Sequence, residues 1–248
     1  MAKKMPDIKE TPDKKELPDM TLALSSISAE KNWYQKVLIG SLFLFVSSAI
    51  VHVNNLFLPL AVILNGVASG YLLRVMRSSM KGDYKTLPEW NQWLDLMISG
   101  VSWMAICLSF SFCGMSLALG LALWGLGQHS VNVLSDQFST WGLTSFLSLY
   151  TYLVLASAFT SILMANFAEE EKMLAGFAWR KVLVRITKHP VLLISAWLSG
   201  WTLTFLASTI PFLTVVLSLL APFLTFMSQV IAARLMGTAW ALTAESKA

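Results

Sequence analysis

The residues of this chain that could do chemistry are few, and the most distinctive are cationic. Lys181, Arg185 and Lys188 are spaced by four and three residues, which places them on one face of a helix, beside the apolar residues Val182 and Ile186. Such a stripe is typical of a helix on a membrane surface, where basic side chains meet anionic lipid headgroups or a partner protein. A solvated charged face that anchors a helical bundle would give the same pattern.

Uncharged polar residues within long apolar stretches form a second group. Asn65 and Gln229 could line a polar path for a small neutral or lipid-like substrate, or they could hydrogen-bond between helices. No Asp or Glu lies in the middle of these stretches, so the carboxylate relay of a proton-coupled carrier is missing. We therefore do not expect active transport.

Histidines and cysteines follow no metal-site pattern. The three histidines lack HxxxH and HExxH spacings, and Cys107 and Cys113 share no helix face. His52 or His129 could ligate a pigment or haem, but a lone histidine near a membrane surface is more often a polar cap. The sequence also lacks GxSxG, Walker A and Rossmann glycine motifs. We expect neither a cofactor nor an enzymatic activity.

The elements that position these residues are predicted to span a membrane. Of the 248 residues, 56% are hydrophobic and 13% are charged, and the mean hydropathy is +0.63. This composition lies outside the range of soluble domains. Crossing a hydrocarbon core of ~30 Å takes ~20 helical residues. On that basis the long uncharged stretches divide into six spans, predicted at 37–53, 56–76, 97–123, 146–167, 191–207 and 212–236.

The third apolar stretch could instead form two short helices broken at Gly114. Charge placement favours one helix, because six spans put all 18 Lys and Arg on one side and leave Asp136 as the only full charge on the other. The positive-inside rule then places both termini in the cytoplasm. Basic residues that flank apolar spans, without a stripe of stacking aromatics, argue against nucleic-acid binding.

Two segments between spans are too polar to cross the membrane and too apolar to leave it. In residues 77–95, Pro88 suits the first turn of a helix, and Trp90 and Trp93 lie one turn apart and face the headgroups. Residues 169–188 begin with three glutamates at an expected helix start and contain the cationic stripe. We predict an all-α fold, an integral membrane bundle of six transmembrane helices with two cytoplasmic interfacial amphipathic helices.

The domain division follows from these elements. Residues 1–28 are predicted to be a disordered, in part amphipathic, cytoplasmic tail, 29–242 the transmembrane domain, and 243–248 a cytoplasmic C-terminus. Small residues four apart predict close helix packing, within the bundle or in a homodimer. The residues singled out for this role are Gly66, Gly70, Ser157, Ser161 and Gly237.

Several short motifs, taken in order along the chain, resemble one family. They are the run from Trp33 to Gly40, Gly70-Tyr71-Leu72-Leu73-Arg74, Leu87-Pro88-Glu89-Trp90 with Trp93, Phe177 and Val182 before His189-Pro190, and Pro222-Phe223 followed by Gly237. From about Ala29 onward the chain resembles the prokaryotic membrane family called domain of unknown function 4013. The resemblance implies a polytopic protein of the cytoplasmic membrane and assigns no activity or catalytic residue.

From the sequence we favour a non-enzymatic accessory, scaffold or assembly subunit of a larger membrane complex. Its expected location is a prokaryotic cytoplasmic membrane or a specialised photosynthetic membrane, and its expected partners are other membrane proteins and anionic lipid headgroups. The alternative is a passive transporter or channel for a small neutral or lipid-like substrate, with kinks at Gly66 and Pro222. A water-accessible cavity that reaches Asn65 and Gln229 would favour transport, whereas a tightly packed bundle would favour the accessory role.

Overall fold

The computed structural model of the protein describes residues 23, 25, 27–83, 86–127, 136–209 and 220–245, without the side chains of 55, 117–149 and 245. These residues form helices and no strand, and 3₁₀ turns occupy Asn55–Phe57 and Met173–Phe177. The α-helices with described bounds are α2 (Trp33–Val53), α3 (Leu58–Met80), α4 (Trp93–Gly127), α5 (Asp136–Glu170), α6 (Trp179–Lys188), α7 (Pro190–Thr209) and α9 (Ala221–Glu245).

Five segments are long and apolar enough to cross a membrane: α2, α3, the Trp93–Ser116 part of α4, the Tyr150–Glu170 part of α5, and α7. This is the composition of a multi-pass membrane protein. The sixth predicted span, 212–236, overlaps α9, and its first residues lie outside the described chain. α9 is not one of the five segments. It carries buried polar side chains, among them Ser228 and Arg234, which protein neighbours rather than lipid surround.

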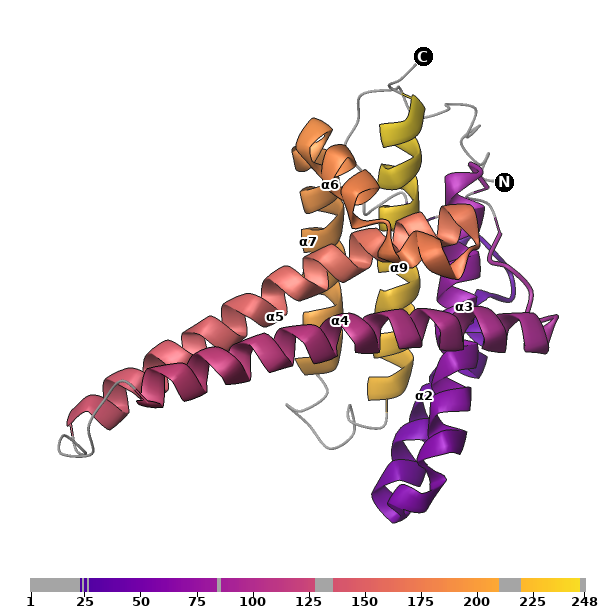
Figure 1. Cartoon of the computed structure of the whole chain (residues 1–248). Coiled ribbons are helices and arrows are strands. Elements are labelled where there is room, and N and C mark those ends of the chain that lie inside the picture. The colour runs from indigo at the N-terminus through magenta and orange to yellow at the C-terminus, as the bar shows by residue number, and fades with distance from the viewer. Residues whose placement is uncertain are drawn as a thin grey trace.

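α4 and α5 cross the group formed by α2, α3, α7 and α9 and continue past it as a pair (Figure 1). Each has 35 residues, about 52 Å of helix, which is more than a ~30 Å bilayer core requires. An apolar helix of this length tilts in the membrane. α4 is continuous through Gly114, so the prediction of one long third helix is confirmed.

The ends of the helices show where the sequence-based boundaries hold. The short connection predicted between the spans 37–53 and 56–76 is confirmed: α2 ends at Val53, and Asn54 Oδ1 accepts a hydrogen bond from the Leu56 backbone N–H at 2.8 Å. α5 begins at Asp136, well before residue 146, where the fourth span was predicted to start. α9 continues to Glu245, past the predicted end of the transmembrane domain at residue 242. Of the N-terminal tail predicted for residues 1–28, the structure describes residues 23, 25, 27 and 28, which are helical, and Ile27 is buried. The other residues of this tail lie outside the described chain.

The predicted helix beginning at Pro88 is wrong. Residues 86–92, here called the strap, have no helical structure, and α4 begins only at Trp93. Pro88 disfavours the helical conformation of the residue before it and lacks an N–H donor. The strap instead exchanges hydrogen bonds with side chains of three helices, as described below.

The prediction of three glutamates at a helix start is also wrong. Glu169 and Glu170 end α5, and Glu171 follows with a φ of 57°. Phe167 and Ala168 of α5 are buried. Their packing stabilises the helix as far as the glutamates that follow them. The cationic stripe does form a helix, α6, after a short connection.

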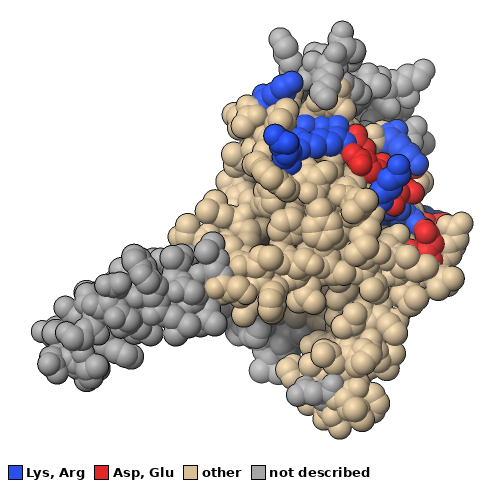
Figure 2. Space-filling model, viewed as in Figure 1, with Lys and Arg blue, Asp and Glu red and all other residues tan. Residues whose placement is uncertain are grey.

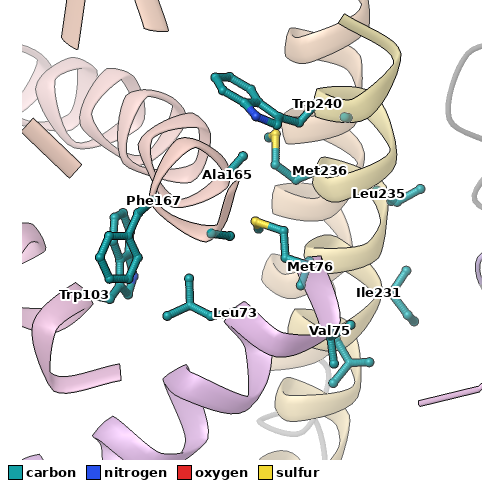
Figure 3. Close-up of a cluster of buried hydrophobic side chains, with 14 of the residues drawn as sticks. Leu73, Val75, Met76, Trp103, Ala165, Phe167, Ile231, Leu235, Met236 and Trp240 are labelled. Carbon is teal, nitrogen blue, oxygen red and sulfur yellow. The ribbon is translucent and has the colours of Figure 1, made fainter. Parts of the chain in front are cut away.

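The core lies where α3, α4, α5 and α9 meet. Met76 of α3 and Met236 of α9 belong to one buried cluster, and the Met236 side chain extends toward Trp240 (Figure 3). Trp103 of α4 stacks on Phe167 of α5 with ring centroids 6.1 Å apart. Trp240 of α9 is fully buried next to them. This packing fixes the ends of α3, α5 and α9 and so positions the charged side chains around them.

Candidate functional site

The strap is held by side chains of α2, α3 and α9 that donate hydrogen bonds to its backbone carbonyls. A non-helical segment beside a membrane needs such donors, because its carbonyls have no intrahelical partner. The donor and acceptor pairs are Arg234 Nη2 with Thr86 at 2.9 Å, Lys36 Nζ with Leu87 at 2.6 Å, the Tyr71 hydroxyl with Pro88 at 3.1 Å, and Arg74 Nη1 with Glu89 at 3.2 Å and Asn91 at 2.9 Å.

Lys36 is the centre of this arrangement. Its Nζ lies 2.6 Å from a carboxylate oxygen of Glu30 and 2.6 Å from one of Glu89. Glu30 in turn accepts a hydrogen bond from the Leu87 backbone N–H at 2.7 Å. Lys36 is buried, so the two carboxylates and the carbonyl compensate a charge that is largely shielded from water.

The two tryptophans predicted to face the headgroups together take different positions. Their rings lie 5.6 Å apart, and Trp93 is 46% exposed. Trp90 instead stacks on Tyr71 at 3.9 Å and donates its Nε1–H to the Lys36 carbonyl at 2.9 Å. Trp90 therefore attaches the strap to α2 and α3. Of the two tryptophans, Trp93 has the exposure expected of a residue at the membrane interface.

Two cations of the predicted stripe turn toward the end of α5. Lys181 forms ion pairs with Glu169 and Glu170, and Arg185 lies 3.2 Å from Glu169. Arg185 is only 7% exposed, and its guanidinium lies 4.1 Å from the Trp240 ring centroid. Within the described residues, its Nε and Nη1 have no hydrogen-bond partner.

A pocket of about 310 Å³ adjoins these residues and is here called the α6 pocket. It contains all three cations that the sequence predicted as lipid or partner contacts. Figure 2 shows the Lys and Arg of this face in one band at the end of the bundle where α6 lies. The residues that line the pocket are Arg180, Lys181, Val184, Arg185, Lys188, His189 and Thr243.

The small residues of α3 allow close contact with α4. A Cβ atom at Gly70 would overlap the Leu96 carbonyl, and one at Gly100 would overlap the Gly66 carbonyl. Gly237 of α9 likewise lies against the backbone of Met76. The predicted small residues of α3 and α9 thus serve contacts within the chain.

A second pocket, of about 240 Å³, lies between α3, α5, α7 and α9 and is here called the four-helix pocket. Its lining is mainly apolar, and its polar members are Ser157, Ser161, Thr204 and Gln229. The three hydroxyls donate to carbonyls of their own helices. The Gln229 side chain forms no hydrogen bond with any other described residue, so its amide is available to a ligand.

Asn65 lies apart from this pocket. Its Nδ2 donates a hydrogen bond to Ser47 Oγ of α2, which donates to the Ala61 carbonyl at 3.1 Å. Gln229 therefore lines a pocket, whereas Asn65 forms a hydrogen bond that links α3 to α2. Asn65 is not among the residues that line the four-helix pocket.

The described histidines do not belong to a group of possible metal ligands. His52 lies in the last turn of α2 and is exposed, and His129 lies outside the described residues. In the part of the chain that the structure describes, no group of three or more His, Cys, Asp or Glu could hold a metal ion. Cys107 and Cys113 are free thiols on α4.

Comparison with known proteins places the chain in a family. The family described as "Protein of unknown function (DUF4013)" matches residues 55–221 of the 248. The chain belongs to this family. Its match includes the strap, α6 and α7, and it excludes the run from Trp33 to Gly40 and Gly237, on which part of the resemblance rested. No curated protein and no solved structure matches the chain.

Two features inside the DUF4013 match escaped the sequence-based reasoning. The strap is not apparent from the sequence because hydrogen bonds between side chains and carbonyls leave no periodic pattern. Its local signal is Pro88, which also suits the first turn of a helix. Gly100 is not apparent because its partner Gly66 lies on another helix, so the two form no small-residue pair along one helix.

Proposed function

We propose that this DUF4013 protein is a non-enzymatic membrane protein that binds a small neutral or lipid-like molecule in the four-helix pocket. The observation that carries the proposal is the Gln229 amide, which lines an otherwise mostly apolar pocket and has no hydrogen-bond partner among the described residues. An unpaired amide in apolar surroundings is unfavourable. A ligand with an apolar body and one polar group would satisfy both kinds of lining.

The position of the pocket supports a ligand that arrives through the membrane. Ser161 lies near the middle of the Tyr150–Glu170 span candidate, and Gly200 lies near the middle of α7. The volume of about 240 Å³ is just below the range of drug-sized sites, ~300–1,000 Å³. The pocket therefore suits a small molecule or one segment of a longer chain.

Filling the pocket tests this proposal. Ser161→Phe puts a ring into the pocket, and Ser109→Phe is its matched control, because Ser109 Oγ also donates to a carbonyl four residues earlier but lies on the exposed face of α4. Native mass spectrometry of protein purified in mild detergent is expected to show retained lipid-like molecules in the wild type and in Ser109→Phe. Ser161→Phe is expected to lose at least tenfold of this occupancy. Equal occupancy in all three proteins would refute the proposal.

The accessory role that the sequence favours remains a second candidate, supported by the α4–α5 pair. This pair continues past the rest of the bundle (Figure 1). Large apolar side chains on its described part are exposed, with Leu108 at 70%, Phe112 at 72% and Leu155 at 64%. A helix pair that extends beyond its own bundle can reach a neighbouring membrane protein.

Site-specific photo-crosslinking in native membranes tests the accessory role. A photoreactive residue at Leu108 or Phe112 is expected to capture a specific protein, whereas one at Leu38, an exposed apolar position of α2, captures only lipid. Lipid adducts alone at all three positions would count against a protein partner on this face.

We further propose that the charged end of the bundle faces the cytoplasm of a prokaryotic cell, with both termini on that side. The positive-inside rule supports this orientation. In a variant without Cys107 and Cys113, a cysteine replacing the exposed Lys188 is expected to resist membrane-impermeant reagents in intact cells and to react after lysis. Labelling from outside would reverse the proposed orientation.

A further inference from the structure

The α6 pocket has more positive charge than the described residues around it neutralise. Four of its described lining residues are Lys or Arg, and none of these lining residues is Asp or Glu. Glu169 and Glu170 lie behind the pocket and pair with Lys181 and Arg185. Within the described residues, Arg180 and Lys188 form no ion pair. Two cationic charges therefore remain for a ligand, which must be anionic.

Arg185 adds an independent observation. It lines the pocket while being 7% exposed, and its Nε and Nη1 lack acceptors within the described part of the chain. A buried guanidinium with unused donors is a poor structural element unless an acceptor completes it. Arg binds phosphate oxygens through the fork of its N–H groups, and Lys binds the same group as a point charge.

Apolar side chains next to the pocket indicate whether a phosphate bound there would belong to a lipid or to a soluble molecule. Val184 lines the pocket itself and is 52% exposed. From two residues after His189, α7 presents an exposed apolar stripe formed by Val191, Ile194 and Leu198, at spacings of three and four residues. A lipid whose phosphate lies in the pocket could place an acyl chain along this stripe, whereas a soluble phosphoester would leave it unused.

We propose that the α6 pocket is a specific site for the phosphate group of an anionic membrane phospholipid, held by Arg180, Lys188 and Arg185, with an acyl chain along the exposed stripe of α7. This site is separate from the four-helix pocket: its ligand is anionic and lies at the charged end of the bundle, and it can exist whether or not a lipid-like molecule binds between the helices.

The test compares two lipids with identical acyl chains on the full-length protein in mild detergent. Native mass spectrometry is expected to give at least tenfold tighter binding of phosphatidylglycerol than of phosphatidylcholine. The double variant Arg180→Gln/Lys188→Gln is expected to lose about tenfold in affinity for phosphatidylglycerol and to keep the weak affinity for phosphatidylcholine. Both replaced residues are exposed, so the variant should fold, which thermal unfolding checks.

A matched control separates a site from general surface charge. Lys31→Gln/Lys81→Gln removes the same charge at exposed positions outside the pocket, and it is expected to change the affinity less than twofold. An equal loss in both double variants would overturn the proposal, because the effect would then be one of surface potential. Glycerol phosphate tests the source: weak binding supports a lipid, and binding as tight as that of phosphatidylglycerol would assign a soluble phosphoester instead.

Discussion

The strap and the α6 pocket lie at the same end of the bundle, and they treat their cations differently. At the strap, Lys36, Arg74 and Arg234 each donate to a backbone carbonyl, and Lys36 and Arg74 also pair with carboxylates. In the α6 pocket, Arg180 and Lys188 do neither with any other described residue. The two regions thus contain similar residue types, but the strap cations have partners within the described chain and these two pocket cations do not.

The presence of a cation therefore does not by itself indicate its role. A cation that has acceptors within the protein stabilises the fold, whereas one without them is available to a ligand. Each strap cation replaces the missing helical partner of a carbonyl, so its removal leaves a polar group unpaired. Removal of Arg180 or Lys188 leaves no group of the described residues without its partner. Stability and ligand affinity should therefore respond to opposite sets of substitutions.

The largest effect is expected from Gly70→Leu, which disrupts the close crossing of α3 and α4, the two helices next to the strap. Its side chain would overlap the Leu96 backbone at the crossing of α3 and α4, and backbone cannot shift as a flexible side chain does. We expect little folded protein in size-exclusion chromatography after detergent extraction. Ile63→Phe adds bulk at an exposed position of α3 and should behave as the wild type. A well-folded Gly70→Leu protein would show that the helix crossing is not tight.

Lys36→Met is expected to have the next largest effect. It leaves Glu30, Glu89 and the Leu87 carbonyl without their cation. We expect the free energy of unfolding to fall by about 2–3 kcal/mol, measured by denaturant titration in micelles. Lys31→Met, at an exposed position five residues earlier, serves as the control. Similar stability of both variants would mean that the strap cations are not structural.

Tyr71→Phe removes a single interaction of the strap. The hydroxyl that donates to the Pro88 carbonyl is lost, while stacking of the ring on Trp90 is kept. We expect a loss of about 1 kcal/mol in the free energy of unfolding, in the same titration. A loss as large as that of Lys36→Met would indicate that the ring, and not the hydroxyl, has been disturbed.

The smallest effect on stability is expected from Arg180→Met, which provides the other half of the comparison. Because this side chain is exposed and forms no ion pair within the described residues, the unfolding midpoint should stay within error of the wild type. A destabilisation comparable to that of Lys36→Met would remove the distinction between the two regions.

Much of the helical architecture could be predicted from the sequence, since apolar length is a strong signal. The continuous α4, the Asn54 turn and the family all follow from local patterns. Charge spacing also gathered Lys181, Arg185 and Lys188 correctly on one helix.

The rest depends on contacts between segments far apart in the chain. Arg234 reaches Thr86 across 148 positions, and Arg185 reaches Glu169 only because α6 folds back on α5. Nothing in the spacing of Asn65 and Gln229 says that the first bonds to Ser47 while the second lines a cavity. The position of a polar residue within a span predicts that it is away from water. Its hydrogen-bond partner depends on which helices pack together, and local sequence does not give that.

Photoactivatable phospholipid with a reactive group on its acyl chain provides the most direct test of the central claim, that a lipid-like molecule occupies the four-helix pocket. Ala233 and Met236 line this pocket but are only 5% and 3% exposed, so bulk lipid does not reach them. We expect adducts on these residues in the wild type, their loss in Ser161→Phe, and unchanged adducts on the exposed Leu108. Adducts confined to exposed positions such as Leu108 in both proteins would contradict it.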